Sequence, residues 1–452
     1  MVFTNAQLFL GEKGFVRGSF CVRNGRFCNV STEEINIKEG CVDLQGLRVL
    51  PGLVDLHIHG CRGMDLSDGN LEGLHEIGRY LARRGVTAFA PTSMTLPLER
   101  LEAAFRTAAE YANNPPTGGA RLIGIHMEGP YFSEKKKGAQ NAAYLRLPDA
   151  AEVLSLIDKC GLLPSADEPV LQDKYFKSDF AACADKNQLC HSERSEESQA
   201  NIEPPTEVMR HFVPRSEAMK KCESIEDGNR LRSASHSILR FVDIAPELPG
   251  AEKFIRTISK ICKVSVAHTN ASYEEAIRAF DAGASHVTHL FNGMPELLHR
   301  EPGVVGAAFD RKEVTVELIG DGLHNHPSLV RMAFRLFPGR LCLVSDALRC
   351  TGMPDGAYEL GGQKVVLAGG EARLPDGTLA GAATDLYEDL VRVIRFGVPE
   401  TEAILAATKT PAIAAGVFDE LGSLENGKRA DFLVCDKKWN LRQAWIGGVL
   451  VP

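Results

Sequence analysis

The sequence predicts an α/β protein: a parallel (β/α)8 barrel of the TIM type with a small β-sandwich domain formed by both chain termini. Two observations favour this fold class. From about residue 51, short apolar runs alternate with amphipathic stretches, which is typical of parallel strands covered by helices. Residues 1–50 and 416–452 instead contain short strand-like runs with glycine turns. A doubly wound open sheet is the alternative reading of the same alternation.

Eight apolar runs have the length of buried parallel strands. In chain order they are Leu53–His57, Thr87–Pro91, Arg121–Met127, Ile238–Ile244, Val264–His268, His286–Leu290, Val314–Leu318 and Leu341–Ser345. Helical periodicity is expected in Leu71–Arg84, Leu98–Ala112, Ala150–Cys160, Tyr273–Ala282 and Pro327–Phe337. The terminal strands are expected in Cys21–Val30, Ala430–Cys435 and Ala444–Val449. The predicted division is therefore a barrel over 51–415, with 1–50 and 416–452 forming the β-domain.

The segment between Ser165 and Ser237 does not fit the barrel pattern. Leu, Ile, Val and Phe make up roughly 15% of it, too little to bury a core. A loop of this length is foreign to a compact domain. Because it follows a predicted helix and precedes the fourth strand, it is expected on the barrel face opposite the active site. We interpret residues 165–237 as a disordered or foreign in-frame insertion.

The overall composition excludes several functional classes. The chain has 452 residues, 44% of them hydrophobic and 24% charged, as in an ordinary globular protein. A net charge of −8 argues against binding nucleic acid. The chain starts without an export signal, and no apolar run reaches the roughly 18 residues of a membrane span. Twelve scattered cysteines without a CxxC pair predict reduced thiols and a cytoplasmic location.

Two histidines end the first predicted strand. His57 and His59 occupy positions i and i+2, so both imidazoles point to the same face of that strand. An apolar strand has no packing reason to finish in this way, whereas neutral imidazole is the commonest nitrogen ligand of divalent metals. Taken alone, the pair is equally compatible with two ordinary polar residues at a strand end.

Other strand ends supply further ligand types. Glu128 follows the third strand, His268 the fifth, His289 the sixth and Asp346 the eighth. The carboxyl ends of barrel strands meet on one face, so together with the two histidines they predict a metal centre. An open position on zinc lowers the pKa of bound water to roughly 7 and yields hydroxide. Asp346 is then the candidate general base and acid, moving the water proton to a departing amide nitrogen.

Several motifs resemble one enzyme family over the whole chain outside the 165–237 segment. They are PGLVDLHIHG, HMEGPYFSEKKKGAQN, DIAPELPG, AHTNASYEEA, HVTHLFNGMPELLHREPG, DGLHNHP and LVSDALRCTG. The late ENGKRADFLV resembles a wider amidohydrolase signature. The chain resembles the N-acetylglucosamine-6-phosphate deacetylase family of the amidohydrolase superfamily. This resemblance implies metal-dependent hydrolysis of the acetamide of N-acetylglucosamine 6-phosphate to glucosamine 6-phosphate and acetate.

The resemblance also implies ligand roles. Glu128, His268 and His289 match the ligands of the principal metal, and His57 and His59 match those of a second metal that only some members hold. One or two divalent ions per subunit are therefore expected. Zinc is the leading candidate and iron(II) the alternative, since both suit histidine and carboxylate ligands.

The resemblance implies substrate contacts as well. His324 matches a histidine that contacts the substrate, and Asn292 and Gly293 match the stretch that lines the sugar-phosphate site. Gln140 stands where some members have a histidine near the substrate. Arg300 matches an arginine that binds phosphate in the neighbouring subunit, which implies a homodimer. Two alternatives stay open: another N-acyl or cyclic-amide amidohydrolase on the same scaffold, and a catalytically inactive relic.

Overall fold

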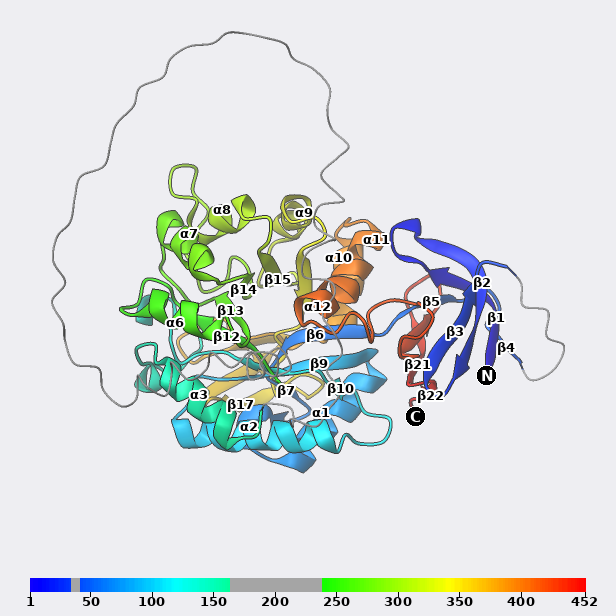
Figure 1. Cartoon of the computed structure of the whole chain (residues 1–452), viewed down its shortest axis with the longest axis horizontal. Helices are drawn as coiled ribbons and strands as arrows, with labels where there is room; N and C mark the ends of the chain where they lie inside the picture. Colours follow the sequence, from blue (N-terminus) through cyan, green and yellow to red (C-terminus); the bar gives the residue numbers. More distant parts are fainter. Residues whose placement is uncertain (34–40, 163–237) are drawn as a thin grey trace, which may run out of the picture. The chain divides into compact units, whose positions relative to one another are not determined.

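The computed structural model describes residues 1–33, 41–162 and 238–452 (Figure 1). The predicted insertion at 165–237 lies outside these residues. Eight strands form the barrel in the order β6, β9, β11, β12, β13, β14, β15, β16, and every neighbouring pair is parallel. A parallel bridge between Ile58 and Ala347 brings the two outermost strands together. The predicted parallel barrel is thus confirmed as a nearly closed sheet.

The barrel strands lie close to the predicted runs. They are β6 (Leu53–Ile58), β9 (Val86–Ser93), β10 (Arg121–Leu122), β11 (Ile125–Met127), β12 (Leu239–Ile244), β13 (Lys263–Val266), β14 (His286–Val287), β15 (Thr315–Ile319) and β16 (Leu341–Val344). The predicted third strand is divided into β10 and β11, which are separated by Gly124 with φ +157°. An added Cβ at Gly124 would lie 2.0 Å from the Arg240 side chain, so the close approach of the chain to β12 at this position requires glycine.

Helices cover the outside of the barrel (Figure 1). They are α1 (Leu71–Arg83), α2 (Leu98–Asn113), α3 (Ala150–Lys159), α6 (Ala251–Ile258), α7 (Tyr273–Ala282), α8 (Gly303–Asp310), α9 (Pro327–Leu336), α10 (Leu386–Arg395), α11 (Glu400–Ala407) and α12 (Lys409–Ala414). Capping sets their ends. Ser272 and Glu275 form a capping box at the start of α7, and Gly283 ends that helix in the left-handed conformation.

A second sheet contains strands from both ends of the chain. Its order is β22-β21-β20-β5-β1-β2-β3, and β4 pairs with β1. The strands are β1 (Val2–Phe9), β2 (Phe15–Arg23), β3 (Arg26–Ser31), β4 (Cys41–Asp43), β5 (Arg48–Pro51), β20 (Phe432–Cys435), β21 (Leu441–Ile446) and β22 (Val449–Leu450). Figure 1 shows the blue N-terminal strands beside the red C-terminal ones. The prediction that both termini build one β-domain is confirmed.

Two predicted terminal strands are wrong in detail, because each one runs across a hairpin turn. Cys21–Val30 contains the turn between β2 and β3 at Asn24 and Gly25, which both have positive φ. Ala444–Val449 contains the turn at Gly447 and Gly448 between β21 and β22. Glycine adopts positive φ without steric cost, so consecutive glycines favour a tight turn over a continuous strand.

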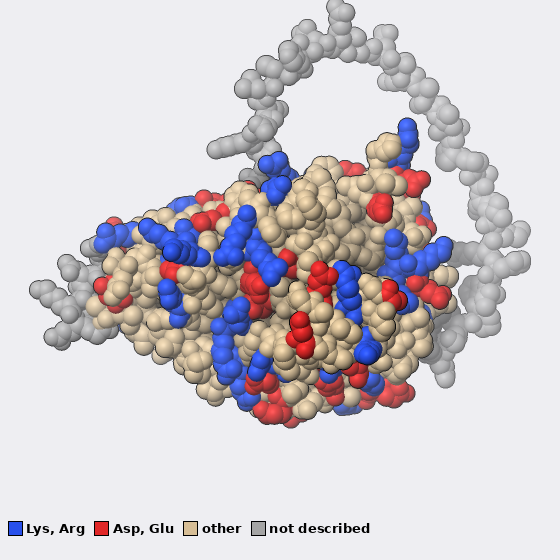
Figure 2. Space-filling view, turned by 180° about the vertical axis from the view of Figure 1, so that it is seen from behind, with Lys and Arg blue, Asp and Glu red and all other residues tan. Residues whose placement is uncertain are grey.

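Smaller elements complete the described chain. They are β7 (Gly60–Cys61), β8 (Met64–Asp65), β17 (Gly356–Leu360), β18 (Gln363–Ala368), β19 (Glu371–Arg373) and the 3-10 turns η1 (Gly11–Lys13), η2 (Leu66–Asp68), η3 (Glu134–Lys136) and η4 (Ala142–Tyr144). None of the helices in the described residues is long and apolar enough to cross a membrane. On the face shown in Figure 2, basic and acidic side chains lie interspersed.

Candidate active site and metal centre

Six predicted side chains converge at the carboxyl ends of the barrel strands. All six are buried, and five of them follow their strands by one or two residues: His59 after β6, Glu128 after β11, His268 after β13, His289 after β14 and Asp346 after β16. His57 lies within β6. The structure therefore brings together the whole set that the sequence predicted at this face. Two groups of ligand atoms can be distinguished within it.

The first group surrounds one oxygen of Glu128. Oε1 of Glu128 lies 3.0 Å from Nε2 of His268 and 3.1 Å from Nε2 of His289, and these two nitrogens are 3.2 Å apart. On the opposite ring edges, Nδ1 of His268 faces the carbonyl oxygen of Lys136 at 2.9 Å, and Nδ1 of His289 faces that of Asn292 at 3.2 Å. A carbonyl only accepts hydrogen bonds, so each Nδ1 donates, and a neutral ring then presents an Nε2 lone pair to the centre.

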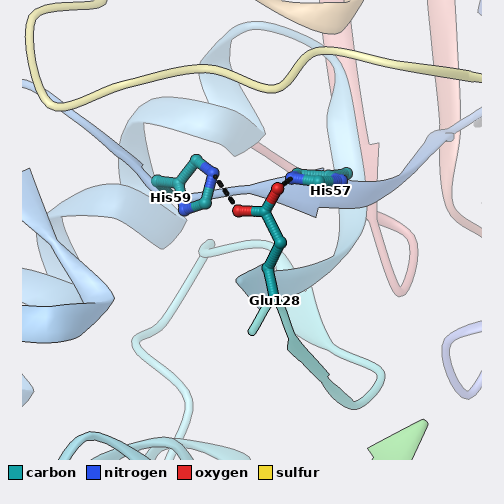
Figure 3. A group of neighbouring side chains, drawn as sticks. All are labelled: His57, His59 and Glu128. Atoms are coloured by element: carbon teal, nitrogen blue, oxygen red, sulfur yellow. Dashed lines mark ion pairs between the residues drawn. The ribbon is translucent and has the colours of Figure 1, made fainter. Parts of the chain in front are cut away.

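The second group uses the histidine pair of β6 (Figure 3). Nε2 of His59 lies 3.2 Å from Oε2 of Glu128 and 3.2 Å from Oδ1 of Asp346. Nε2 of His57 lies 3.5 Å from the same Asp346 oxygen and 3.9 Å from Oε1 of Glu128. Nδ1 of His59 faces the carbonyl oxygen of Thr92 at 3.2 Å. Glu128 thus takes part in both groups.

The donor set fits a divalent cation. When their histidines are neutral, both groups place lone pairs of imidazole nitrogens against carboxylate oxygens, so that only acceptors face one another. Nε2 of His57 is buried and has no hydrogen-bond partner among the described residues. Buried acceptors without donors are costly, and a bound cation satisfies them together. Histidine and carboxylate ligands are those that zinc and related metals take.

The pKa values of the buried side chains are consistent with a site for a divalent cation. Burial would raise the pKa of Glu128, but His268, His289 and His59 hold it well below its usual range. Burial likewise opposes ionisation of Asp346, yet His57 and His59 lower its pKa. Burial disfavours a charged His289 ring, while Glu128 raises its pKa to about 9. Both carboxylates are therefore ionised, and protons compete with a cation for the histidine nitrogens.

The backbone is unusual at three of these positions. His268, His289 and Asp346 have φ angles of +42°, +32° and +50°. Positive φ is uncommon for residues other than glycine and is typical of functional sites. Next to them, Gly293 has φ +63°, and an added Cβ would lie 2.9 Å from Nδ1 of His268. Each of these side chains is thus aimed by a turn that follows its strand.

Gln140 and His324 are both close to the centre, and both are fully hydrogen-bonded to protein groups. Gln140 donates from Nε2 to Oε2 of Glu128 at 2.8 Å, and its Oε1 accepts from the backbone N–H of Thr95 at 2.8 Å. His324 contacts Oδ2 of Asp321 through Nδ1 and the carbonyl oxygen of Ala380 through Nε2, both at 2.7 Å. Through its hydrogen bond, Gln140 orients Glu128, which is a candidate metal ligand.

The three remaining predicted residues lie together after β14. Asn292 is half-buried and donates from Nδ2 to the carbonyl oxygen of Leu290 at 3.2 Å, and Gly293 follows it. Arg300 is exposed in the segment 296–301. Within the described chain, its guanidinium forms no hydrogen bond or ion pair with the other site residues. It therefore remains free to meet a ligand or a partner subunit.

Sequence reasoning missed a deeper set of charged side chains inside the barrel. Glu317 of β15 lies 3.0 Å from Nδ1 of His57, and His126 of β11 lies 2.8 Å from Asp243 of β12. All are fully buried. The available signal was a carboxylate in the middle of the apolar run Thr-Val-Glu-Leu-Ile, which on its own reads as an ordinary strand residue.

Comparisons with known proteins identify relatives of this chain. The model of the amidohydrolase family matches residues 251–451. N-acetylglucosamine-6-phosphate deacetylase of Vibrio furnissii is 31% identical over 95% of this chain and 89% of its own length. N-acetylgalactosamine-6-phosphate deacetylase of Escherichia coli O157:H7 is also 31% identical, over 98% of both chains.

Solved structures show the same fold. N-acetyl-D-glucosamine-6-phosphate deacetylase of Mycobacterium smegmatis, in a D267A mutant bound to N-acetyl-D-glucosamine-6-phosphate, superposes with a TM-score of 0.77 at 25% identity, covering 100% of this chain and 99% of that one. The chain belongs to the amidohydrolase family and is a hydrolytic enzyme. Within that family, its predicted resemblance to the N-acetylglucosamine-6-phosphate deacetylases is confirmed over nearly its full length.

Proposed function

We propose that the chain hydrolyses the acetamide of N-acetylglucosamine 6-phosphate to glucosamine 6-phosphate and acetate. The observation that carries this proposal is the convergence of four histidines and two carboxylates, from five barrel strands, on one buried centre. Relatives whose names specify this reaction match the chain almost from end to end, which supports the choice of substrate.

Each ligand has a proposed role. Glu128, His268 and His289 would hold the first divalent cation, and His57 and His59, together with Glu128, would hold a second. Zinc is the proposed ion, with iron(II) as the alternative. When bound, such a cation acidifies water and polarises an amide carbonyl. The surrounding imidazoles keep their Nε2 lone pairs directed inward because backbone or carboxylate groups accept from Nδ1.

Asp346 is the proposed general base and acid. Its Oδ1 lies beside both imidazoles of β6, and its pKa is lowered, so at neutral pH it is ready to accept a proton. It takes the proton from the attacking water and passes it to the amide nitrogen as the C–N bond breaks. Amine and acetate leave, and Asp346 returns to the carboxylate form.

The substrate contacts are proposals of the same kind. Asn292 and Gly293 would line the sugar, and His324 would hydrogen-bond the acetamide oxygen. For that, Nε2 of His324 must exchange the carbonyl of Ala380 for the substrate. Gln140 would influence substrate binding indirectly, because it donates a hydrogen bond to Oε2 of Glu128.

The phosphate contact and the assembly are linked. We propose that Arg300 binds the phosphate in the site of a neighbouring subunit, so that the working unit is a homodimer. The exposed position of Arg300 supports this role, and its planar guanidinium suits two phosphate oxygens. A cytoplasmic location is proposed because all nine described cysteines are free thiols. Domain boundaries near residues 50 and 416 are proposed from the pattern of the two sheets.

N-acetylgalactosamine 6-phosphate is a second candidate substrate, because the relative named for it is as similar to this chain as the glucosamine enzyme. Acetate release by zinc-loaded protein from both sugar phosphates and from unphosphorylated N-acetylglucosamine tests the proposal. Faster turnover of N-acetylglucosamine 6-phosphate than of the other two is the expected result. Preference for the galactosamine isomer would establish the second candidate, and preference for the unphosphorylated sugar would contradict both.

A further inference from the structure

A buried polar layer lies behind His57, deeper in the barrel, and the reaction proposed above makes no use of it. Its members are fully buried and come from two pairs of neighbouring strands: His126 of β11, Asp243 of β12, His286 of β14 and Glu317 of β15. Branched apolar side chains normally fill this part of a parallel barrel. Buried charges cost folding free energy unless they are paired, so this layer requires a reason.

Glu317 is held between two imidazoles. Its Oε2 lies 3.0 Å from Nδ1 of His57, and its Oε1 lies 3.1 Å from Nε2 of His286. His286 is fixed in turn by the Thr315 hydroxyl, which lies 2.5 Å from its Nδ1. A carboxylate only accepts, so both rings donate to Glu317, and the Thr315 hydroxyl lies between the other nitrogen of His286 and the carbonyl oxygen of Ser285, which is 3.3 Å away. Nε2 of His57 is therefore left as a lone pair.

The other charges of the layer balance one another. Nε2 of His126 lies 2.8 Å from Oδ1 of Asp243, and the Thr288 hydroxyl donates to the same oxygen at 2.9 Å. Glu317 also has His126 in range, because its Oε1 lies 3.7 Å from Nδ1 of that ring, and its Oε2 accepts from the backbone N–H of His289 at 3.4 Å. His57, at 3.0 Å, is the nearest ring to Glu317 and the one whose other nitrogen faces the metal centre.

His57 differs in this respect from the other three histidines. His59, His268 and His289 direct Nδ1 to neutral backbone carbonyls, of Thr92, Lys136 and Asn292. Only His57, among these four, directs it to a carboxylate. Metal-ligating histidines that donate to a carboxylate are fixed in one tautomer and become more basic ligands, and loss of the carboxylate costs 10–100-fold in affinity.

We infer that Glu317 is the positioning residue of the second cation site: it orients His57 and supplies the negative charge that makes this ring a strong ligand. The inference rests on the two-cation centre of the proposed function. Nδ1 of His57, Nδ1 of His126 and Glu317 also lie within ligand range of one another. Because Nδ1 of His126 faces the carbonyl of Leu56 at 3.1 Å, we assign hydrogen bonds rather than a third ion to this group.

The test measures bound zinc per chain against buffered free zinc, without substrate, in Glu317→Gln and in Thr315→Val. Glutamine keeps the shape of the side chain and removes its charge. Valine removes the hydroxyl from His286 and leaves the contact between Glu317 and His57, so it is the matched control. Wild type and Thr315→Val are expected to bind two ions. Glu317→Gln is expected to keep its first affinity and to bind the second ion about 10–100-fold more weakly.

The inference would be overturned if Glu317→Gln bound both ions with equal affinity, or if it bound both equally more weakly than wild type does. It would also be overturned if wild type bound one ion or three ions instead of two. A second measurement requires no change at Glu317. In metal-free wild type labelled with 15N-histidine, the His57 signal, identified by its loss in His57→Gln, is expected from the Nδ1–H tautomer. An Nε2–H tautomer would contradict the inference. Two bound ions without acetate release would reject the proposed function alone.

Discussion

The core of the terminal sheet and the mouth of the barrel are equally buried but are held together differently. In the terminal sheet, the rings of Phe3, Phe20 and Phe432 pack with centroids 4.7–5.2 Å apart, and Trp445 stacks on Phe432 at 5.4 Å. At the barrel mouth, imidazoles and carboxylates that are at most 7% exposed face one another. The first region is packed with apolar rings, whereas the second is a group of ligands suited to a cation.

This difference separates stability from function within one chain. Burying apolar rings stabilises a fold by about 25 cal/mol per Å² of area, wherever the rings lie. Burying ionisable groups costs free energy, and that cost is offset only where the groups have partners. Changes in the terminal core should therefore act on stability, and changes at the barrel mouth on activity, metal binding and pH dependence.

The largest effect is expected at the barrel mouth from Asp346→Asn. The amide keeps the shape of the side chain but cannot accept the water proton, so kcat should fall by about 10²–10⁴-fold. Because the lowered pKa of Asp346 means that its charge stabilises the fold, the melting temperature of the metal-free protein should fall modestly, whereas turnover should be almost lost. Acetate release and thermal unfolding measure the two quantities. A large loss of stability with retained turnover would contradict the assignment of Asp346 as the base.

The opposite profile is expected in the terminal core from Phe432→Ala. Phe432 is fully buried, and truncating a buried phenylalanine costs about 3–5 kcal/mol in the free energy of unfolding. Zinc per chain should remain at the wild-type value, because no metal ligand contacts this ring. Urea unfolding and metal analysis check both statements. Exposed Val449 is the control, since Val449→Ala should change stability by less than about 0.5 kcal/mol.

Features that depend on local sequence patterns can be predicted from the sequence. Strand ends carrying His57, Glu128 or Asp346 are predictable because a ligand at a strand end is a local pattern. Helix α7 is predicted with both ends correct because Ser272 and Gly283 mark them. Strand β14 is shorter than predicted because His289 leaves the strand with φ +32°.

Glu317 and its partners could not be predicted in this way. The contact with His57 joins residues 260 positions apart, and the one with His286 spans 31. Nothing local distinguishes a carboxylate inside the barrel from one on its surface. The role of Gln140 at Glu128 was also out of reach, because it depends on which way a loop side chain turns.

Removal of metal should distinguish the two regions directly. A cation that binds only the folded state stabilises it by about 2.7 kcal/mol at 100 times Kd and about 4.1 at 1,000 times Kd. A chelator should therefore lower the melting temperature, and added zinc should restore it. The free energy lost should be the same in Phe432→Ala, since distant sites contribute additively. A chelator effect that disappears in Phe432→Ala would show that the regions are coupled.

The smallest effect concerns the His324–Asp321 pair at the edge of the mouth. Both ring nitrogens of His324 face acceptors at 2.7 Å, so the ring carries both hydrogens and is a cation. Burial acts to lower the pKa of His324, but the Asp321 carboxylate raises it above the ordinary value of about 6.5. The stabilisation is therefore complete below about pH 6.5 and is lost as pH rises through the folded-state pKa.

The expected result is a free energy of unfolding that decreases above about pH 6.5, with a shallower decrease in Asp321→Asn; each unit of pKa shift is worth about 1.4 kcal/mol. Measurement on zinc-loaded protein keeps the ligand histidines from titrating. Phe432→Ala, with its stability changed elsewhere, should keep the wild-type slope. An unchanged slope in Asp321→Asn would mean that His324 is neutral in the folded protein. A neutral His324 would keep its only hydrogen on Nδ1, where it is donated to Asp321. Nε2 would then have no hydrogen to donate to the carbonyl of a substrate, so the proposed substrate contact of His324 would also be wrong.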